Sequence, residues 1–306
     1  MLKHRLLMSA LLIPAMIGLF VWDAQFSHEQ APILFVVVLA ISARCVWELV
    51  TLSRAAGFRP SLALCWVWTW FVLFAGWSPH LYGGSQMSFL FQWREYAGFN
   101  WLVGATLSIL FVSIFRFRTT SPTDLETNRP LPPGHHLASA GIEFFIIQYV
   151  GVLLMITTRL RWTLDGGYFA LGALVIATKM GDVGAYTFGR LIGGPKMTPR
   201  LSPGKTWAGG VGHIVTAGLS SAAWLCWIGP QINGHWHAWQ VWPAIVFGVV
   251  VGFAGLMGDL AESLIKRDVG VKDAPALLPG FGGLLDLMDS LLLAGPVAYG
   301  MWHLLR

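Results

Sequence analysis

Residues 257–290 place acidic and basic side chains between two strongly apolar segments. Asp259, Glu262, Ser263 and Lys266 recur at intervals of three and four residues, which places them on one face of a helix. Charge next to apolar segments of this kind is costly, so it is usually retained for a function. This face is therefore the first candidate for chemistry.

Two further carboxylates, Asp286 and Asp289, stand three residues apart at the start of the following apolar run. A proline and three glycines between residues 279 and 283 predict a bend that brings the two helix ends together. Carboxylates on two such ends are suitable ligands for a hard cation. The spacing therefore indicates a metal site between two helices.

A second charged helix is expected around residues 178–190. Lys179, Asp182 and Tyr186 share one helical face there, and the glycines at 181, 184 and 189 permit close backbone approach. We expect both charged side chains to line a polar cavity. An ion pair internal to the protein, with the glycines serving only helix packing, is the alternative.

The segment that follows, residues 189–206, is a basic glycine-rich loop. Its cations, hydroxyls and exposed backbone N–H groups would suit a phosphate chain. The spacing Gly-x-x-x-x-Gly-Lys-Ser/Thr of a Walker A loop is absent from it. The alternative interpretation is that these cations only fix membrane topology.

Composition defines the elements that must position these residues. Hydrophobic residues make up 55% of the 306 residues and charged residues only 11%, which indicates a polytopic membrane protein. The apolar runs are long and continuous, which excludes a barrel of alternating strands. We predict an all-α protein with about nine transmembrane helices. They are expected near residues 6–23, 31–52, 60–78, 98–115, 137–158, 168–188, 207–228, 241–261 and 284–304.

The distribution of positive charge orients these helices. With a cytoplasmic N-terminus, most of the 20 Lys and Arg residues fall in inner segments. The net charge of +5 is then a topology signal, with anionic lipids rather than nucleic acid as the expected partner. The basic loop and the acidic segment are both expected on the cytoplasmic side.

We expect residues 1–306 to form a single integral membrane domain. Residues 1–130 would supply N-terminal helices and residues 137–306 the catalytic helices and cytoplasmic loops. Residues 1–23 are interpreted as a retained first helix rather than a cleaved signal peptide. Chemistry is expected in the second half, where most of the charges within predicted spans lie.

The spacing of these charged residues resembles the signature of the phosphatidate cytidylyltransferases, also called CDP-diacylglycerol synthases. The matching residues are Ser263, Lys266, Arg267, Lys272, Asp273, Pro279, Gly280, Gly282, Gly283, Asp286 and Asp289. An upstream block also resembles this family. It consists of Asp182, Ala185, Tyr186, Gly189, Arg190, Ser202, Pro203, Lys205, Thr206 and Trp207.

The chain departs from the family pattern at four positions. Phe281 replaces a histidine, Leu287 an arginine, Pro275 a small residue and Ala208 a glutamate. These changes remove polar contacts. The protein could therefore use an altered substrate, belong to a divergent subfamily or be an inactive relative. The retained carboxylates and the Lys-Asp pair argue against loss of activity.

The resemblance implies that CTP and phosphatidate react to CDP-diacylglycerol and pyrophosphate. It implies Mg²⁺ as the catalytic ion, with a second cation such as K⁺. The expected metal ligands are Asp259, Asp286 and Asp289. The expected catalytic residues are Asp259, Asp286, Lys266, Lys272 and Asp273. The residues expected to bind substrate or phosphate are Asp182, Arg190, Ser202, Lys205, Thr206, Ser263, Arg267, Gly282 and Gly283.

The physical requirements of this reaction agree with the residue types. A phosphate monoester with a second pKa of about 6 is largely dianionic at neutral pH, so phosphatidate needs no strong general base. Catalysis would instead consist of positioning and cationic stabilisation. We expect an inner (plasma) membrane protein with its active site facing the cytoplasm, and the resemblance implies a homodimer.

The sequence is also compatible with two other functions. One is a related CTP-dependent enzyme acting on another lipid, such as a polyprenol kinase or an isoprenoid-ether lipid cytidylyltransferase. The other is an ion-coupled transporter that uses the intramembrane charges as a relay. Broken helices in both halves would favour a transporter, whereas the glycine-rich interruptions here are confined to the second half.

Overall fold

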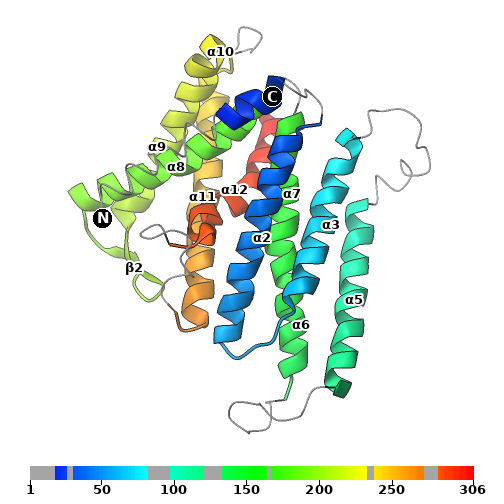
Figure 1. Ribbon diagram of the computed structural model, residues 1–306. Coiled ribbons are helices and arrows are strands. Elements are labelled where there is room, and N and C mark those ends of the chain that lie inside the picture. Colours follow the sequence, from blue (N-terminus) through cyan, green and yellow to red (C-terminus); the bar gives the residue numbers. More distant parts are fainter. Residues whose placement is uncertain are drawn as a thin grey trace. The chain divides into compact units, whose positions relative to one another are not determined.

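The computed structural model describes residues 18–25, 30–81, 97–119, 133–163, 167–232, 238–271 and 282–306. These residues are almost entirely helical, as Figure 1 shows. The predicted all-α class is confirmed. One small hairpin of two strands, which the sequence analysis treated as a loop, is the exception.

Among the described residues, seven helical stretches are long and apolar enough to cross a bilayer, and each overlaps a predicted span. They are Pro32–Ala55, Leu62–His80, His135–Trp162, Tyr168–Leu191, Trp207–Ile232, Val241–Asp268 and Leu284–Leu305. The run predicted at 98–115 is also helical, but its apolar part is shorter, Val103–Phe115. The run predicted at 6–23 lies mostly outside the described residues. The count of nine therefore stays a prediction.

The chain divides into two compact units. One comprises residues 1–26 together with 156–306, and the other comprises residues 27–155. The expected single domain, with its halves at 1–130 and 137–306, stays a prediction. All the charged segments singled out above belong to the first of these units.

The unit of residues 27–155 is a helical bundle. Its elements are α2 (Pro32–Ala55), α3 (Leu62–Leu81), α5 (Ala97–Thr119), α6 (His135–Ile146), the π-helical turn η1 (Ile147–Val152) and the start of α7 (Leu153–Thr158). The backbone N–H of Ser61 donates to Glu143 Oε1 at 2.6 Å. A carboxylate here satisfies one of the free N–H groups at the beginning of α3 and stabilises that helix end.

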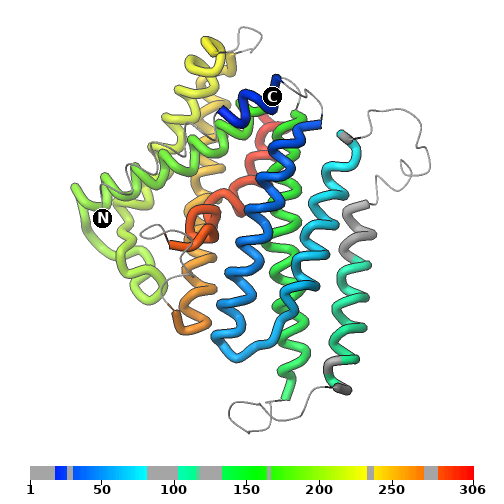
Figure 2. Tube along the Cα trace, in the orientation of Figure 1, coloured from blue at the N-terminus to red at the C-terminus, as the bar shows by residue number. Residues whose placement is uncertain are grey.

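The other unit is built around α8 (Tyr168–Leu191), α9 (Trp207–Ala222), α11 (Val241–Asp268) and α12 (Leu284–Leu305). It also contains the helical residues 18–25, the end of α7, η2 (Arg159–Trp162), β1 (Lys196–Thr198), β2 (Ser202–Thr206), η3 (Ala223–Ile228) and α10 (Gly229–Ile232). Figure 2 traces α8 and α9 side by side, and these two helices are packed together. The antiparallel β1–β2 hairpin connects them.

Glycines allow the helices of this unit to approach closely. A Cβ added at Gly212 on α9 would lie 2.6 Å from Phe188 Cβ on α8. A Cβ at Gly248 on α11 would lie 2.6 Å from Ser221 Oγ on α9. Small residues of this kind drive helix packing in membranes, where no hydrophobic difference separates lipid from protein. The expected close approach through glycine is confirmed for Gly184, whose Cβ would lie 2.6 Å from Gly212 O.

Candidate active site

The charged face of α11 meets the beginning of α12. Lys266 Nζ lies 3.1 Å from Glu262 Oε2, one turn earlier on α11, and 2.6 Å from Asp286 Oδ1 on α12. The prediction that these two helix ends meet is confirmed, while residues 279–281 of the predicted bend lie outside the described residues. Lysine and carboxylate side chains are therefore interleaved at this junction.

The residues before α12 shape its first turn. The backbone N–H of Gly283 donates to Asp286 Oδ2 at 2.8 Å, so Asp286 caps the helix that carries it. Gly282 has a φ of 81° and would bring a Cβ to 2.6 Å from Asp286 Oδ2. Glycine at 282 is thus required by the backbone conformation and by the space that Asp286 occupies.

Asp289 lies one turn further along α12 and is buried. The backbone N–H and the hydroxyl of Ser290 both donate to its Oδ1. Directly opposite is Gly258 on α11, where an added Cβ would lie 3.1 Å from Ser290 Cα and closer still to the Asp289 carbonyl oxygen. Asp259, the residue after Gly258, lies within electrostatic range of Asp289, and the two carboxylates repel each other.

The hairpin brings basic side chains to this acidic helix. Lys205 Nζ on β2 lies 2.7 Å from Asp259 Oδ2, an ion pair without hydrogen-bond geometry. Arg267 Nε on α11 donates to Leu201 O at 3.3 Å. The expectation that the basic loop and the acidic segment face one another is confirmed for these residues.

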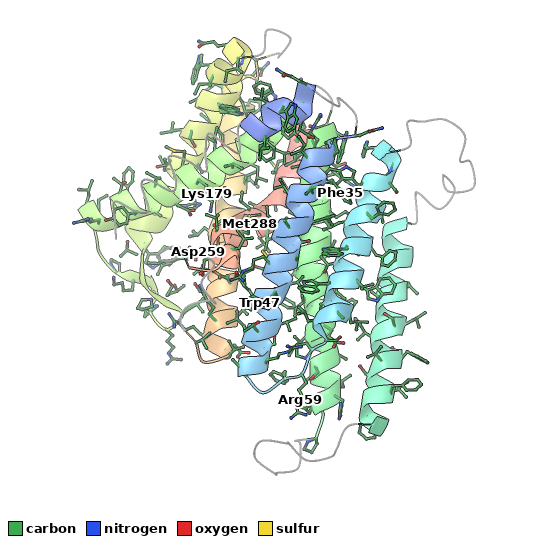
Figure 3. The ribbon with its side chains drawn as sticks, viewed as in Figure 1. Phe35, Trp47, Arg59, Lys179, Asp259 and Met288 are labelled. Carbon is green, nitrogen blue, oxygen red and sulfur yellow. The ribbon has the colours of Figure 1, made fainter. Side chains whose placement is uncertain are left out.

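Helix α8 supplies the last charged groups. Lys179 Nζ lies 3.5 Å from Asp182 Oδ2 and donates to Leu287 O on α12 at 3.0 Å. His213 Nδ1 on α9 lies 3.7 Å from Asp182 Oδ1, and this histidine is only 1% exposed. Figure 3 shows Lys179, Asp259 and Met288 in the same region of the molecule, on α8, α11 and α12. The ion pair between Lys179 and Asp182, which was the alternative to a polar cavity, is present, whereas the cavity stays a prediction.

His213 was not predicted as a site residue. This histidine lies between glycines of two neighbouring helices, since a Cβ at Gly181 would fall 2.6 Å from His213 Nε2 and one at Gly252 would fall 3.9 Å from it. Within the described part of the chain His213 Nε2 has no hydrogen-bond partner. A single histidine inside an apolar, glycine-rich run was the only available signal.

Several predicted site residues make other contacts. Arg190 Nη1 donates to Tyr186 OH at 2.7 Å on its own helix, and Thr206 Oγ1 accepts from Gly209 N at 3.1 Å as the N-cap of α9. Ser202 pairs with Thr198 in the hairpin. Ser263 lies on α11 beside Glu262, with a partly exposed side chain. Lys272, Asp273, Pro275 and Phe281 lie outside the described residues.

The carboxylates of this cluster suit a hard divalent cation in kind, because Mg²⁺ prefers carboxylate oxygens. Glu262 Oε1 is buried and has no hydrogen-bond partner among the described residues. Among the same residues, no group of three His, Cys, Asp or Glu side chains is close enough together to hold a metal ion. Lysines lie between the carboxylates instead. A cation would therefore have to displace lysine contacts.

The charge balance of the cluster also fits a cation. Within the described ranges it contains the carboxylates Asp182, Asp259, Glu262, Asp286 and Asp289 and the lysines Lys179, Lys205 and Lys266. If all are ionised, carboxylates exceed lysines by two. Such an excess in a partly buried site favours a bound cation or bound protons.

A helical membrane unit with a lysine–carboxylate cluster at the junction of α8, β2, α11 and α12 agrees with what sequence comparison finds. The sequence model of the cytidylyltransferase family matches residues 3–305. The chain belongs to this family.

Over the matched segments, individual relatives are about a third identical to this chain. YnbB of Escherichia coli, an uncharacterized protein, is 36% identical over 155 residues, which cover 51% of this chain and 48% of that protein. The phosphatidate cytidylyltransferase of Mycobacterium leprae is 34% identical over 177 residues, 57% of this chain and 53% of that enzyme. The enzyme of the same name from Mycobacterium bovis is 31% identical over 231 residues, 74% of this chain and 70% of that enzyme. The matched region thus spans about half the length of the first two relatives.

Proposed function

We propose that this protein transfers a cytidylyl group from CTP to phosphatidate, giving CDP-diacylglycerol and pyrophosphate. Membership of the cytidylyltransferase family and the names of two relatives support the reaction class. The observation that carries the proposal is the cluster in which Lys205 and Lys266 stand against Asp259 and Asp286. Such an arrangement can hold both cations and phosphates.

The proposed reaction needs positioning rather than proton removal. An oxygen of the lipid phosphate attacks the α-phosphorus of CTP, and the bond from that phosphorus to the β-phosphate oxygen breaks. Pyrophosphate leaves with the bonding electron pair. Because the lipid phosphate is already an anion at neutral pH, the obstacle is repulsion between two anionic substrates.

The lysines and carboxylates would divide this task. Lys205 and Lys266 each lie within 3 Å of a carboxylate and would turn to phosphate oxygens when substrate binds. Asp259, Asp286 and Asp289 would hold Mg²⁺. When bound, this ion would neutralise charge on the reacting phosphates.

The location of the substrates agrees with the expected topology. CTP is a polar cytosolic nucleotide, whereas the acyl chains of phosphatidate stay in the bilayer. An inner-membrane protein with the hairpin and the end of α11 on the cytoplasmic side would reach both. This sidedness rests on the charge distribution of the sequence.

A product assay tests the proposal. Membranes containing the protein are supplied with CTP labelled in the base, phosphatidate and Mg²⁺, and with the same mixture plus excess EDTA. We expect a lipid-soluble cytidine product that disappears with EDTA. With CTP labelled at the γ-phosphate and a polyprenol in place of phosphatidate, transfer of the label to the polyprenol hydroxyl would instead indicate a kinase. Failure to form any cytidine lipid from phosphatidate, by protein that still binds CTP, would contradict the proposal.

A further inference from the structure

Lys179 differs from the other two lysines of the cluster. Lys205 and Lys266 lie 2.7 Å and 2.6 Å from a carboxylate oxygen, whereas Lys179 lies 3.5 Å from its nearest one, on Asp182. The side chain of Lys179 is 33% exposed, against 19% for Lys205 and 13% for Lys266. Lys179 is thus the most loosely paired and most accessible of the three.

The backbone contact of Lys179 places its charge at the beginning of α12. Its Nζ donates to the carbonyl oxygen of Leu287, in the first turn of that helix. Asp289 lies within electrostatic range of Lys179 two residues further on. An ammonium group has three donors, so these contacts leave capacity for an anionic ligand.

Exposed apolar side chains flank Lys179 along α8. Val175 and Val183 lie four residues before and after it, on the same face of the helix, and are 45% and 54% exposed. Leu287, whose carbonyl accepts from Lys179, has a side chain that is 49% exposed. In a membrane-spanning helix such a stripe offers apolar surface to acyl chains.

The position of Lys179 in the helix strengthens this argument. It lies near the middle of α8, a helix of 24 residues that is apolar enough to cross a bilayer. A lysine at such depth, on an outward-facing stripe, costs roughly 3 kcal/mol even on lenient scales. The ion pair at 3.5 Å, one backbone hydrogen bond and the nearby Asp289 offset only part of that cost. A function in binding explains why a cation stands there.

We propose that Lys179 binds the phosphate of the lipid substrate, whose acyl chains lie along the exposed apolar stripe formed by Val175 and Val183. This inference rests on the proposed function and deepens it. It gives the lipid phosphate a cation on α8 and leaves Lys205 and Lys266 to the phosphates of CTP. When the lipid binds, its phosphate then replaces Asp182 as the anionic partner of Lys179.

Separate Michaelis constants for the two substrates test this assignment. In detergent micelles, Lys179→Gln keeps an N–H donor for Leu287 O but removes the positive charge. We expect the KM for phosphatidate, expressed as mole fraction in the micelle, to rise about 10-fold or more, with little change in the KM for CTP. Lys179→Arg, which keeps the charge, should restore most of the affinity for the lipid.

A double variant provides an independent check. Leu287→Arg places a guanidinium at the same first turn of α12, at the position where the family resemblance expects an arginine. Combined with Lys179→Gln, it should lower the KM for phosphatidate again. A melting temperature within a few degrees of wild type would show that both variants are folded.

The outcomes separate the two proposals. If the wild-type protein forms no cytidine lipid, the proposed function fails. If the wild type is active and Lys179→Gln leaves the KM for phosphatidate unchanged, or raises only the KM for CTP, the assignment of Lys179 is wrong while the proposed function stands.

Discussion

At the scale of single residues, Asp286 combines two roles that can be separated. Its Oδ2 accepts from Gly283 N and caps α12, while its Oδ1 faces Lys266. In Asp286→Asn the amide oxygen can still accept the Gly283 N–H, so the helix end should persist, but the negative charge is gone. We expect initial rates to fall about 100-fold or more with the melting temperature nearly unchanged.

Asp268→Asn is the matched control for this change. Asp268 is the last residue of α11 and is exposed, so its variant should keep wild-type rates. Comparable rates for Asp286→Asn and wild type would refute the role of Asp286 as a cation ligand. A large drop in melting temperature for Asp286→Asn would instead show that the cap dominates.

The residues that sequence could identify are those whose spacing has a structural meaning. Glu262 and Lys266 contact each other because they are one helical turn apart. The contact of Lys179 with Leu287 O was not predictable, because it joins residues 108 positions apart and every residue offers a carbonyl. His213 was also missed, since one histidine in an apolar run has no periodicity from which to judge burial.

At the scale of elements, the crossing of α11 and α12 depends on the absence of a side chain at 258. In Gly258→Ala the new Cβ would collide with the backbone at Asp289 and Ser290, which cannot move as a flexible side chain would. We expect the two helices to separate slightly and the free energy of unfolding to fall by about 1–3 kcal/mol. Activity should fall too, because Asp259 and Asp289 are carried apart.

Gly300→Ala is the control, because an added Cβ on this α12 glycine meets no atom within 4 Å. This variant should be neutral or more stable by up to about 1 kcal/mol, as expected for alanine in a helix. Thermal unfolding in detergent together with initial rates distinguishes the two variants. Equal stability for both would show that α12 is not held against α11 by close backbone contact.

The long helices could be predicted from the sequence, whereas the short hairpin could not. Long apolar runs predicted about nine spans, because a bilayer demands about 20 apolar residues per helix, and seven of them are found among the described residues. The β1–β2 hairpin was missed because strands of three and five residues in a basic, glycine-rich segment show no alternation of apolar and polar residues. The pairing of the two strands fixes the position of Lys205, whose Nζ lies 2.7 Å from Asp259 Oδ2. An irregular loop would not fix this position.

At the scale of the whole molecule, the distribution of positive charge predicts which side of the membrane each helix end faces. The span Trp207–Ile232 begins with α9 and ends with α10. Residue 200 lies in the hairpin before the first end of this span, and residue 231 lies at its other end. Arg200 and Gln231 are both exposed. A cysteine at either position should therefore be reachable from one side of the membrane only.

The native thiols allow this experiment with little background. Cys45 and Cys65 are fully buried, and Cys226 can be replaced by serine. We expect a membrane-impermeant thiol reagent to label Gln231→Cys in intact cells and Arg200→Cys only in inside-out vesicles. Labelling of Arg200→Cys in intact cells would place the hairpin, and with it the cluster around Asp259, on the side away from cytosolic CTP. A cytosolic hairpin agrees with the proposed reaction, because Lys205 can reach both the nucleotide and the membrane-embedded carboxylates only from that side.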